Sequence, residues 1–195
     1  MFGFLPSPDS WQDMVYNPSL PGFEIPAEYS FLKYMPEVYN QGNLPYCVPC
    51  SLMAWLEWKQ KTADDDKALP RIKDIYEARE DKYEEGMDFK SAFKYLREQD
   101  EIKYYGRVGS ILHLKSAIFF NGPCFGALPV YDTTENEFWE GENLIAYHAV
   151  SIIGYLESDF IIRNSWGREY GKDGYWTIGM EKAKELFKEI WTIIK

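Results

Sequence analysis

The sequence predicts an α+β protein, with a mainly helical first half and a mainly β second half. Apolar residues recur at helical spacing between about residues 47 and 120, whereas short apolar runs bounded by Gly, Asn and Asp follow residue 124. The 195 residues are 46% hydrophobic and 17% aromatic, which is enough to bury one core. We therefore expect a single folded unit over residues 1–195 with two segregated lobes.

Residues 1–40 are expected to form an extended arm over the core. The segment is rich in proline, and proline cannot continue a long helix or donate a ladder hydrogen bond. The residues on which this expectation depends are Pro6, Pro8, Pro18, Pro21, Gly22, Pro26 and Pro36.

Residues 41–115 are expected to form the helical lobe. The run from Cys47 to Thr62 has no internal Gly and is apolar around most of its circumference, which indicates a buried helix. Pro49 falls in the first turn of that helix, where a missing N–H is tolerated. Two further helical pieces are expected over residues 70–100, on either side of Gly86, and another over residues 112–120.

Residues 116–195 are expected to form the β lobe. A late amphipathic helix is expected over residues 181–190, followed by a closing strand over residues 191–195. The strands expected before it are 124–131, 146–155, 160–164 and 175–178.

Charge and composition exclude several classes of partner. The chain has 21 Lys and Arg against 31 Asp and Glu, a net charge of −10, so it repels phosphate backbones and anionic lipid. We expect no nucleic-acid partner and no membrane partner, and no pattern specifies an oligomeric state. The chain has no secretory signal and no apolar run of transmembrane length, and its three cysteines do not suggest a disulfide framework. These features predict a cytoplasmic or otherwise intracellular protein, with association with a virion as an alternative.

The sequence contains a candidate for an activated thiol, a base to lower its pKa, and a third residue to orient that base. A thiol attacks carbonyl carbon as the thiolate, and a helix N-terminus or a neighbouring imidazolium lowers the pKa of the thiol. Cys47 lies at the start of the buried helix. His148 enters an apolar strand that would hold it rigidly, and Asn164 follows the next apolar run, in a position to orient the imidazole. His113 lies in an ordinary amphipathic helix, and we expect Cys124 in the core.

Four ordered motifs resemble the papain family of cysteine peptidases. Gln41 precedes Cys47 by six residues, as a Gln precedes the nucleophile in that family. His148-Ala-Val with Gly154-Tyr155 resembles the family's histidine strand, and Arg163-Asn-Ser-Trp-Gly167 resembles its Asn-Ser-Trp-Gly motif. Asn121-Gly-Pro-Cys-Phe-Gly-Ala127 is similar to the strand that opens the family's β lobe. The segment at Leu20-Pro21 resembles microbial or viral branches of the family.

The resemblance implies a papain-like two-lobe fold, with a β-barrel-like C-terminal lobe and the active site in the cleft between the lobes. It implies a hydrolase acting on protein or peptide substrates through a Cys–His–Asn mechanism and an acyl-enzyme, with no cofactor and no metal. Cys47 would be the nucleophile, His148 its base and Asn164 the residue that orients the base.

The resemblance also implies supporting roles. The side chain of Gln41 and the backbone N–H of Cys47 would form the oxyanion hole. Trp166 would cover the hydrogen bond between His148 and Asn164. Gly86 and Met87 would pair with the extended backbone of a substrate, and Tyr46 and Trp166 would also belong to the substrate-binding surface.

The sequence departs from the family pattern around the nucleophile. Pro45 and Tyr46 stand where the family has Gly-Ser, and we expect Tyr46 to lie beside the scissile bond and narrow the cleft. Leu44 replaces a half-cystine. The separation of Cys47 from His148 is shorter than the usual one of about 130 to 150 residues, so the loops around the cleft should be trimmed. No inhibitory pro-segment precedes the arm, so we expect either that activity is controlled elsewhere or that the chain is a processed product.

Two alternatives to an active peptidase follow from the same residues. A papain-like scaffold with a blocked cleft would be a binding or structural protein. Cys47 and Cys50 have the spacing of a redox pair at a helix start, although that reading leaves the His and Asn motifs unexplained. A zinc site would lack a second pair of ligands.

Overall fold

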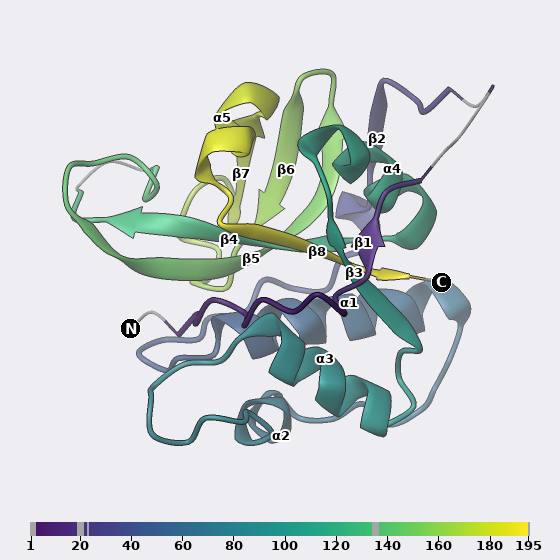
Figure 1. The fold of residues 1–195 in the computed structure, drawn as a ribbon. Coiled ribbons are helices and arrows are strands. Elements are labelled where there is room, and N and C mark those ends of the chain that lie inside the picture. The colour runs from purple at the N-terminus through teal and green to yellow at the C-terminus, as the bar shows by residue number, and fades with distance from the viewer. Residues whose placement is uncertain (1–2, 19–21, 23, 134–136, 195) are drawn as a thin grey trace.

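A computed structural model shows the helices of residues 47–98 on one side of the molecule and, on the other, a large sheet with the later helices beside it (Figure 1). The structure describes residues 3–18, 22, 24–133 and 137–194, so Leu20 and Pro21 lie outside the described residues. Within these ranges, no helix is long and apolar enough to cross a membrane.

The central helix α1 spans Cys47–Ala63, one residue longer than expected, and 11 of its residues are buried. Pro49 lies in its first turn, as predicted, and Asp64 ends the helix in a left-handed conformation with φ 52°. The other helices are η1 (Leu32–Tyr34, a 3₁₀ turn), α2 (Ile72–Glu77), α3 (Phe89–Glu98), α4 (Ile111–Asn121) and α5 (Met180–Leu186).

The sheet contains eight strands and is mostly antiparallel. Its path runs β1-β3-β8-β4-β5-β6-β7, and β2 pairs with β5 off that path. The strands are β1 (Val15–Tyr16), β2 (Glu28–Ser30), β3 (Tyr104–Val108), β4 (Cys124–Tyr131), β5 (Leu144–Leu156), β6 (Asp159–Arg163), β7 (Tyr175–Gly179) and β8 (Glu189–Ile194).

The expected barrel-like closure of the β lobe is wrong, because the sheet is open. Among the described strands, no pairing joins β7 at one edge to β1 at the other. The expected helix over residues 181–190 is also too long. Phe187 leaves the helix in an extended conformation, and Lys188 donates its N–H to the carbonyl of Ala127 at 2.9 Å. The following residues form β8, which pairs with both β3 and β4 and so gains two ladders of hydrogen bonds.

The N-terminal arm lies between the two halves of the molecule. In Figure 1 it runs as a purple trace between α1 and α3 on one side and the strands β4, β5 and β8 on the other. Its inner end forms a parallel bridge between Phe4 and Met87, and its outer part forms β1 beside β3. The arm is therefore packed into the fold both at Phe4 and at β1.

Candidate active site

Cys47 is the first residue of α1 and has no exposed surface. The backbone amides of Ala149, on β5, and of Gly3, on the arm, interact with its thiol. This contact places Cys47 next to the strand residue that follows His148. A helix of 17 residues directs the positive end of its dipole at the thiol, which favours the thiolate once water reaches it.

His148 and Asn164 form a buried hydrogen-bonded pair. The ring Nε2 of His148 lies 2.6 Å from Oδ1 of Asn164, and both side chains are at most 1% exposed. The backbone N–H of Ser165 donates to the same Oδ1 at 2.7 Å. Because an amide oxygen only accepts, this bond fixes the proton of a neutral His148 on Nε2 and leaves Nδ1 as the basic nitrogen. Nδ1 is buried and has no hydrogen-bond partner among the described residues.

Aromatic rings enclose this pair. The ring of Trp166 lies 4.5 Å from the ring of His148 at an interplanar angle of 33°, where the family resemblance places a cover over the hydrogen bond. Phe138 meets the His148 ring edge-on at 5.7 Å and also contacts Trp166 and Trp176. A low-dielectric enclosure of this kind strengthens the hydrogen bond between His148 and Asn164.

Gln41 is held by the loop that carries Asn164. Its Nε2 donates to the carbonyl of Leu44 at 2.8 Å, and the Ser165 hydroxyl donates to its Oε1 at 2.6 Å. The backbone N–H of Gln41 also donates to the carbonyl of Ser165 at 2.8 Å. A backbone carbonyl accepts only, so the Leu44 contact fixes which end of the Gln41 amide carries the N–H groups.

The inner end of the arm covers Cys47. Leu5 donates its N–H to the carbonyl of Met87 at 3.1 Å, and Met87 donates its N–H to the carbonyl of Gly3 at 2.8 Å. Gly3 packs so closely on Pro45 that an added Cβ would lie 2.3 Å from the Pro45 carbonyl oxygen. The arm itself thus occupies the edge at which we expected a substrate backbone.

Burial disfavours charge on both groups of the covered site. Burial raises the pKa of the Cys47 thiol, and the surrounding backbone amides only partly oppose this shift. Burial also lowers the pKa of His148 to about 4, against the effect of its hydrogen bond to Asn164. With the arm in place, both shifts favour the thiol and the neutral imidazole.

The four residues expected to bind substrate lie in different surroundings. Gly86 and Met87 form the edge that pairs with the arm, and Trp166 covers His148. Tyr46 is half-buried, and its ring lies 4.8 Å from that of Tyr76 on α2. Its ring is thus packed against the helical lobe.

The remaining thiols and the second histidine lie apart from this chemistry. Burial raises the pKa of Cys50 and of Cys124 to about 12, and all three cysteines are free thiols. His113 is half-buried, with Nδ1 3.0 Å from the Ser110 hydroxyl. Over the described residues, no three His, Cys, Asp or Glu side chains gather as a metal site.

Sequence reasoning missed two features of the site. It gave no role to Phe138 and Trp139, although an aromatic pair within the acidic stretch 132–143 is itself a signal of burial. It also placed the arm over the core but did not bring Gly3 to Cys47, because no local pattern specifies a contact between residues so distant in the chain.

Comparison with known proteins identifies the family. A model of the papain family of cysteine proteases matches residues 52–190, more than two-thirds of the chain. The chain belongs to the papain family of cysteine proteases. It is a peptidase, and the match includes the segments that carry His148 and Asn164. The family match begins five residues after Cys47, so it does not include Cys47 or Gln41.

Solved structures of cysteine proteases share the fold. Xylellain from Xylella fastidiosa has a TM-score of 0.84 and 22% identity, and the alignment covers 98% of this chain and 95% of that one. Digestive procathepsin L2 from Tenebrio molitor larval midgut has a TM-score of 0.70 and 16% identity, with 94% and 74% covered. The protease and lectin-like domains of Cwp84 from Clostridium difficile give 0.66 and 16%, with 98% and 55% covered. The papain-like two-lobe fold is therefore confirmed. A search of curated proteins found no match.

Proposed function

We propose that this peptidase hydrolyses peptide bonds through Cys47, His148 and Asn164, with Gln41 and the backbone N–H of Cys47 as oxyanion donors. The observation that carries the proposal is the 2.6 Å bond between His148 Nε2 and Asn164 Oδ1, together with a thiol at a helix N-terminus that contacts the backbone of Ala149, the residue after His148. That bond leaves Nδ1 of His148 to take the proton from the thiol.

In the proposed reaction, the Cys47 thiolate attacks the peptide carbonyl carbon and forms a C–S bond. Negative charge develops on the carbonyl oxygen, where the amide of Gln41 and the N–H of Cys47 stabilise it. The C–N bond breaks as the His148 imidazolium donates its proton to the leaving amine. Water, deprotonated by His148, then cleaves the thioester, which releases the acid and restores the thiol.

The arm must leave before a substrate can be cleaved. Its backbone uses the polar groups of Met87, and Cys47 has no exposed surface in its presence. Substrate and arm therefore compete for one edge, and the fraction of open molecules scales the apparent affinity for substrate.

Single substitutions test the proposal in the full chain. Cys47→Ser and His148→Ala should abolish hydrolysis of an unstructured protein substrate, and Asn164→Ala should reduce it. Cys50→Ser is the matched control, because Cys50 is equally buried on the same helix, and it should retain activity. A redox pair would instead depend on Cys50. Wild-type chain that is alkylated at Cys47 by iodoacetamide but hydrolyses nothing would show a binding protein on a peptidase scaffold.

A further inference from the structure

A cluster of polar side chains holds the arm immediately after the residues that cover Cys47. The Ser7 hydroxyl donates to Oε1 of Glu189 at 2.7 Å, and both residues are buried. Arg107 lies 3.2 Å from the other carboxylate oxygen of Glu189, and it donates to the backbone carbonyl of Ser7 at 3.4 Å. A hydroxyl and a carbonyl of the arm thus face an ion pair built on β3 and β8.

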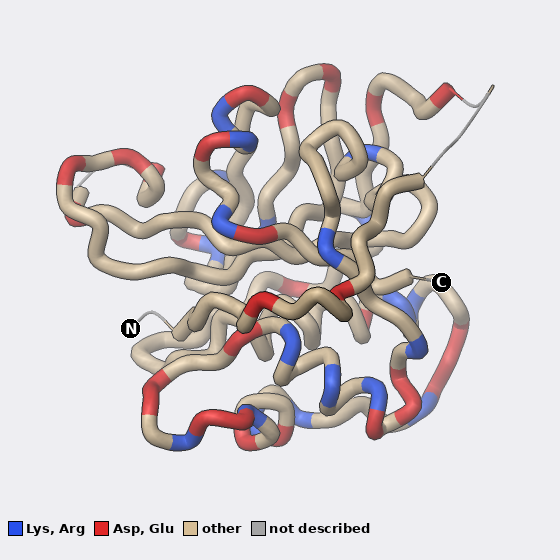
Figure 2. Tube along the Cα trace, viewed as in Figure 1, with Lys and Arg blue, Asp and Glu red and all other residues tan. Residues whose placement is uncertain are grey.

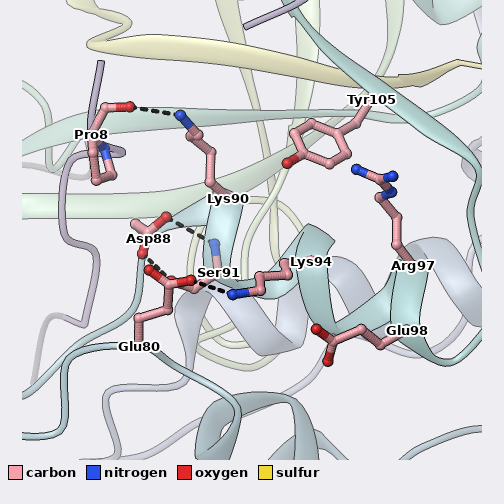
Figure 3. A pocket seen from close by; sticks show the side chains of 9 residues that line it. All are labelled: Pro8, Glu80, Asp88, Lys90, Ser91, Lys94, Arg97, Glu98 and Tyr105. Carbon is pink, nitrogen blue, oxygen red and sulfur yellow. Dashed lines mark hydrogen bonds and ion pairs between the residues drawn. The ribbon is translucent and has the colours of Figure 1, made fainter. Parts of the chain in front are cut away.

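A second cation continues this cluster along the arm. Lys90 on α3 donates to the carbonyl of Pro8 at 2.9 Å and pairs with Asp13 at 2.7 Å (Figure 3 shows the Pro8 contact). Arg107 also reaches Asp13 at 3.3 Å and Asp9 at 3.1 Å. Figure 2 shows acidic positions of the arm beside basic positions of α3 and β3. We call Ser7, Asp13, Lys90, Arg107 and Glu189 the latch.

The buried contacts of the latch stabilise the bound arm more than its exposed contacts do. The Glu189 side chain is 3% exposed, so its carboxylate depends on the partners that replace water. Burial raises the pKa of Glu189, and the Ser7 hydroxyl and Arg107 oppose that shift. In contrast, the Asp9 side chain is 98% exposed, and an exposed pair of this kind contributes little.

The latch lies close enough to the covered thiol to control it. Ser7 is two residues from Leu5, whose N–H bonds to Met87, so the chain between them has little slack. When Ser7 leaves Glu189, the carboxylate loses this hydrogen bond, which opposes release of the arm. The backbone groups of Met87 at the cleft can pair with a peptide in place of the arm.

We propose that the latch is regulatory, and that its buried part, the bond between Ser7 and the ion pair of Glu189 and Arg107, sets how often the arm uncovers Cys47. This inference rests on the proposed function for its biological meaning, since it treats Cys47 as the nucleophile. The opening itself is a property of the fold and is measurable without catalysis.

Hydrogen exchange in a Cys47→Ser background tests the latch independently of peptidase activity. The readout is exchange at the amides of Leu5 and Met87, which are protected only while the arm is in place. Loss of a hydrogen bond to a charged group shifts an equilibrium by about ten- to a hundredfold. Ser7→Ala should therefore accelerate exchange at both amides by about tenfold or more, with the amides between β4 and β5 unchanged.

Matched controls separate the latch from general effects. Ser10→Ala changes a serine of the same arm whose hydroxyl accepts from the backbone N–H of Gln12 at 3.2 Å, and it should leave exchange unchanged. Glu189→Gln should accelerate exchange, whereas Glu101→Gln should not. Glu101 is a carboxylate of 4% exposure that pairs with Lys59 and Lys67, away from the arm.

Two results would overturn the latch. One is exchange at Leu5 and Met87 in Ser7→Ala within about twofold of Ser10→Ala. The other is equal acceleration across β4 and β5, which would mean general destabilisation. Faster exchange without hydrolysis in the corresponding chain with Cys47 would refute the proposed function and leave the latch intact.

Discussion

At the scale of single residues, the covered site shows how burial can make a thiol less reactive by raising its pKa. The helix dipole and a nearby imidazolium would lower the pKa of Cys47, yet burial raises it and lowers the pKa of His148 to about 4. An ion pair of Cys47 and His148 needs water or further hydrogen-bond donors to form. The arm excludes water and does not supply enough donors to replace it. Burial of the site therefore disfavours the ion pair, in addition to limiting access to the thiol.

The pKa of His148 predicts a pH dependence of stability. Its folded value of about 4 lies below the unfolded value of 6.5, so the unfolded chain binds more protons between these pH values. The free energy of unfolding should thus fall as the pH drops from 6.5 to 4, by about 3 kcal/mol at most for this one group. The measurement is urea unfolding against pH for wild type and His148→Gln. The difference between the two cancels the titration of Glu189 and Asp13. Parallel profiles would contradict the prediction.

Gly3 gives a second prediction for a single residue. An added Cβ would lie within 2.4 Å of three backbone atoms of Pro45, which cannot move as a flexible side chain can. Overpacking of this kind costs about 1–3 kcal/mol. Gly3→Ala should therefore shift the arm and raise the rate of Cys47 alkylation by about fivefold or more. Gly179→Ala is the control, because its nearest contact would be an ordinary 3.7 Å. Equal rates for the two variants would argue against the close packing of Gly3.

At the scale of elements, patterns of apolar residues predicted most helices and strands where each element is buried along its own length. Helix α1 and strand β4 match their predicted ranges within one residue. The predictions for residues 181–190 and for β3 were poorer. Helix α5 ends where β8 begins to pair with β3 and β4. The residues of β3 were not predicted as a strand, and β3 also depends on its pairing with β8. A local pattern carries no information on such distant ladders.

Helix α3 begins directly after the edge that binds the arm, and its cap predicts a measurable stability effect. The Asp88 carboxylate accepts from the N–H of Ser91 at 2.9 Å and from its hydroxyl at 2.5 Å. Asp88→Ala should lower the free energy of unfolding by about 1 kcal/mol, because two donors lose their acceptor. Ser110→Ala is the control at a helix start without a capping bond, because the Ser110 hydroxyl meets the ring of His113 at 3.0 Å and caps no backbone N–H of α4. Chemical denaturation measures both, and an equal loss would count against the capping role of Asp88.

At the scale of the whole molecule, the site joins segments that the sequence separates widely. The order of Gln41, Cys47, His148 and Asn164 was enough to predict that they belong to one site, because the family resemblance supplied the fold. The same motifs carried no information on the arm. The arm is bound to the rest of the fold by the hydrogen bond between Ser7 and Glu189, which lie 182 positions apart in the chain. Tertiary contacts of this kind become visible only in the structure.

The arm is an intramolecular ligand, and this predicts a quantitative relation between two experiments. A synthetic peptide of residues 3–14 should inhibit the opened Ser7→Ala chain by occupying the site that its own arm leaves. The same peptide with alanine at position 7 should inhibit less. Both peptides compete with the same tethered arm, so the effective concentration of that arm cancels in their ratio. The ratio of inhibition constants should therefore equal, within about threefold, the acceleration of Leu5 and Met87 exchange that Ser7→Ala causes in the chain. Equal inhibition by the two peptides would mean that Ser7 acts only within the tethered arm, by constraining the chain, and not through its bond to Glu189.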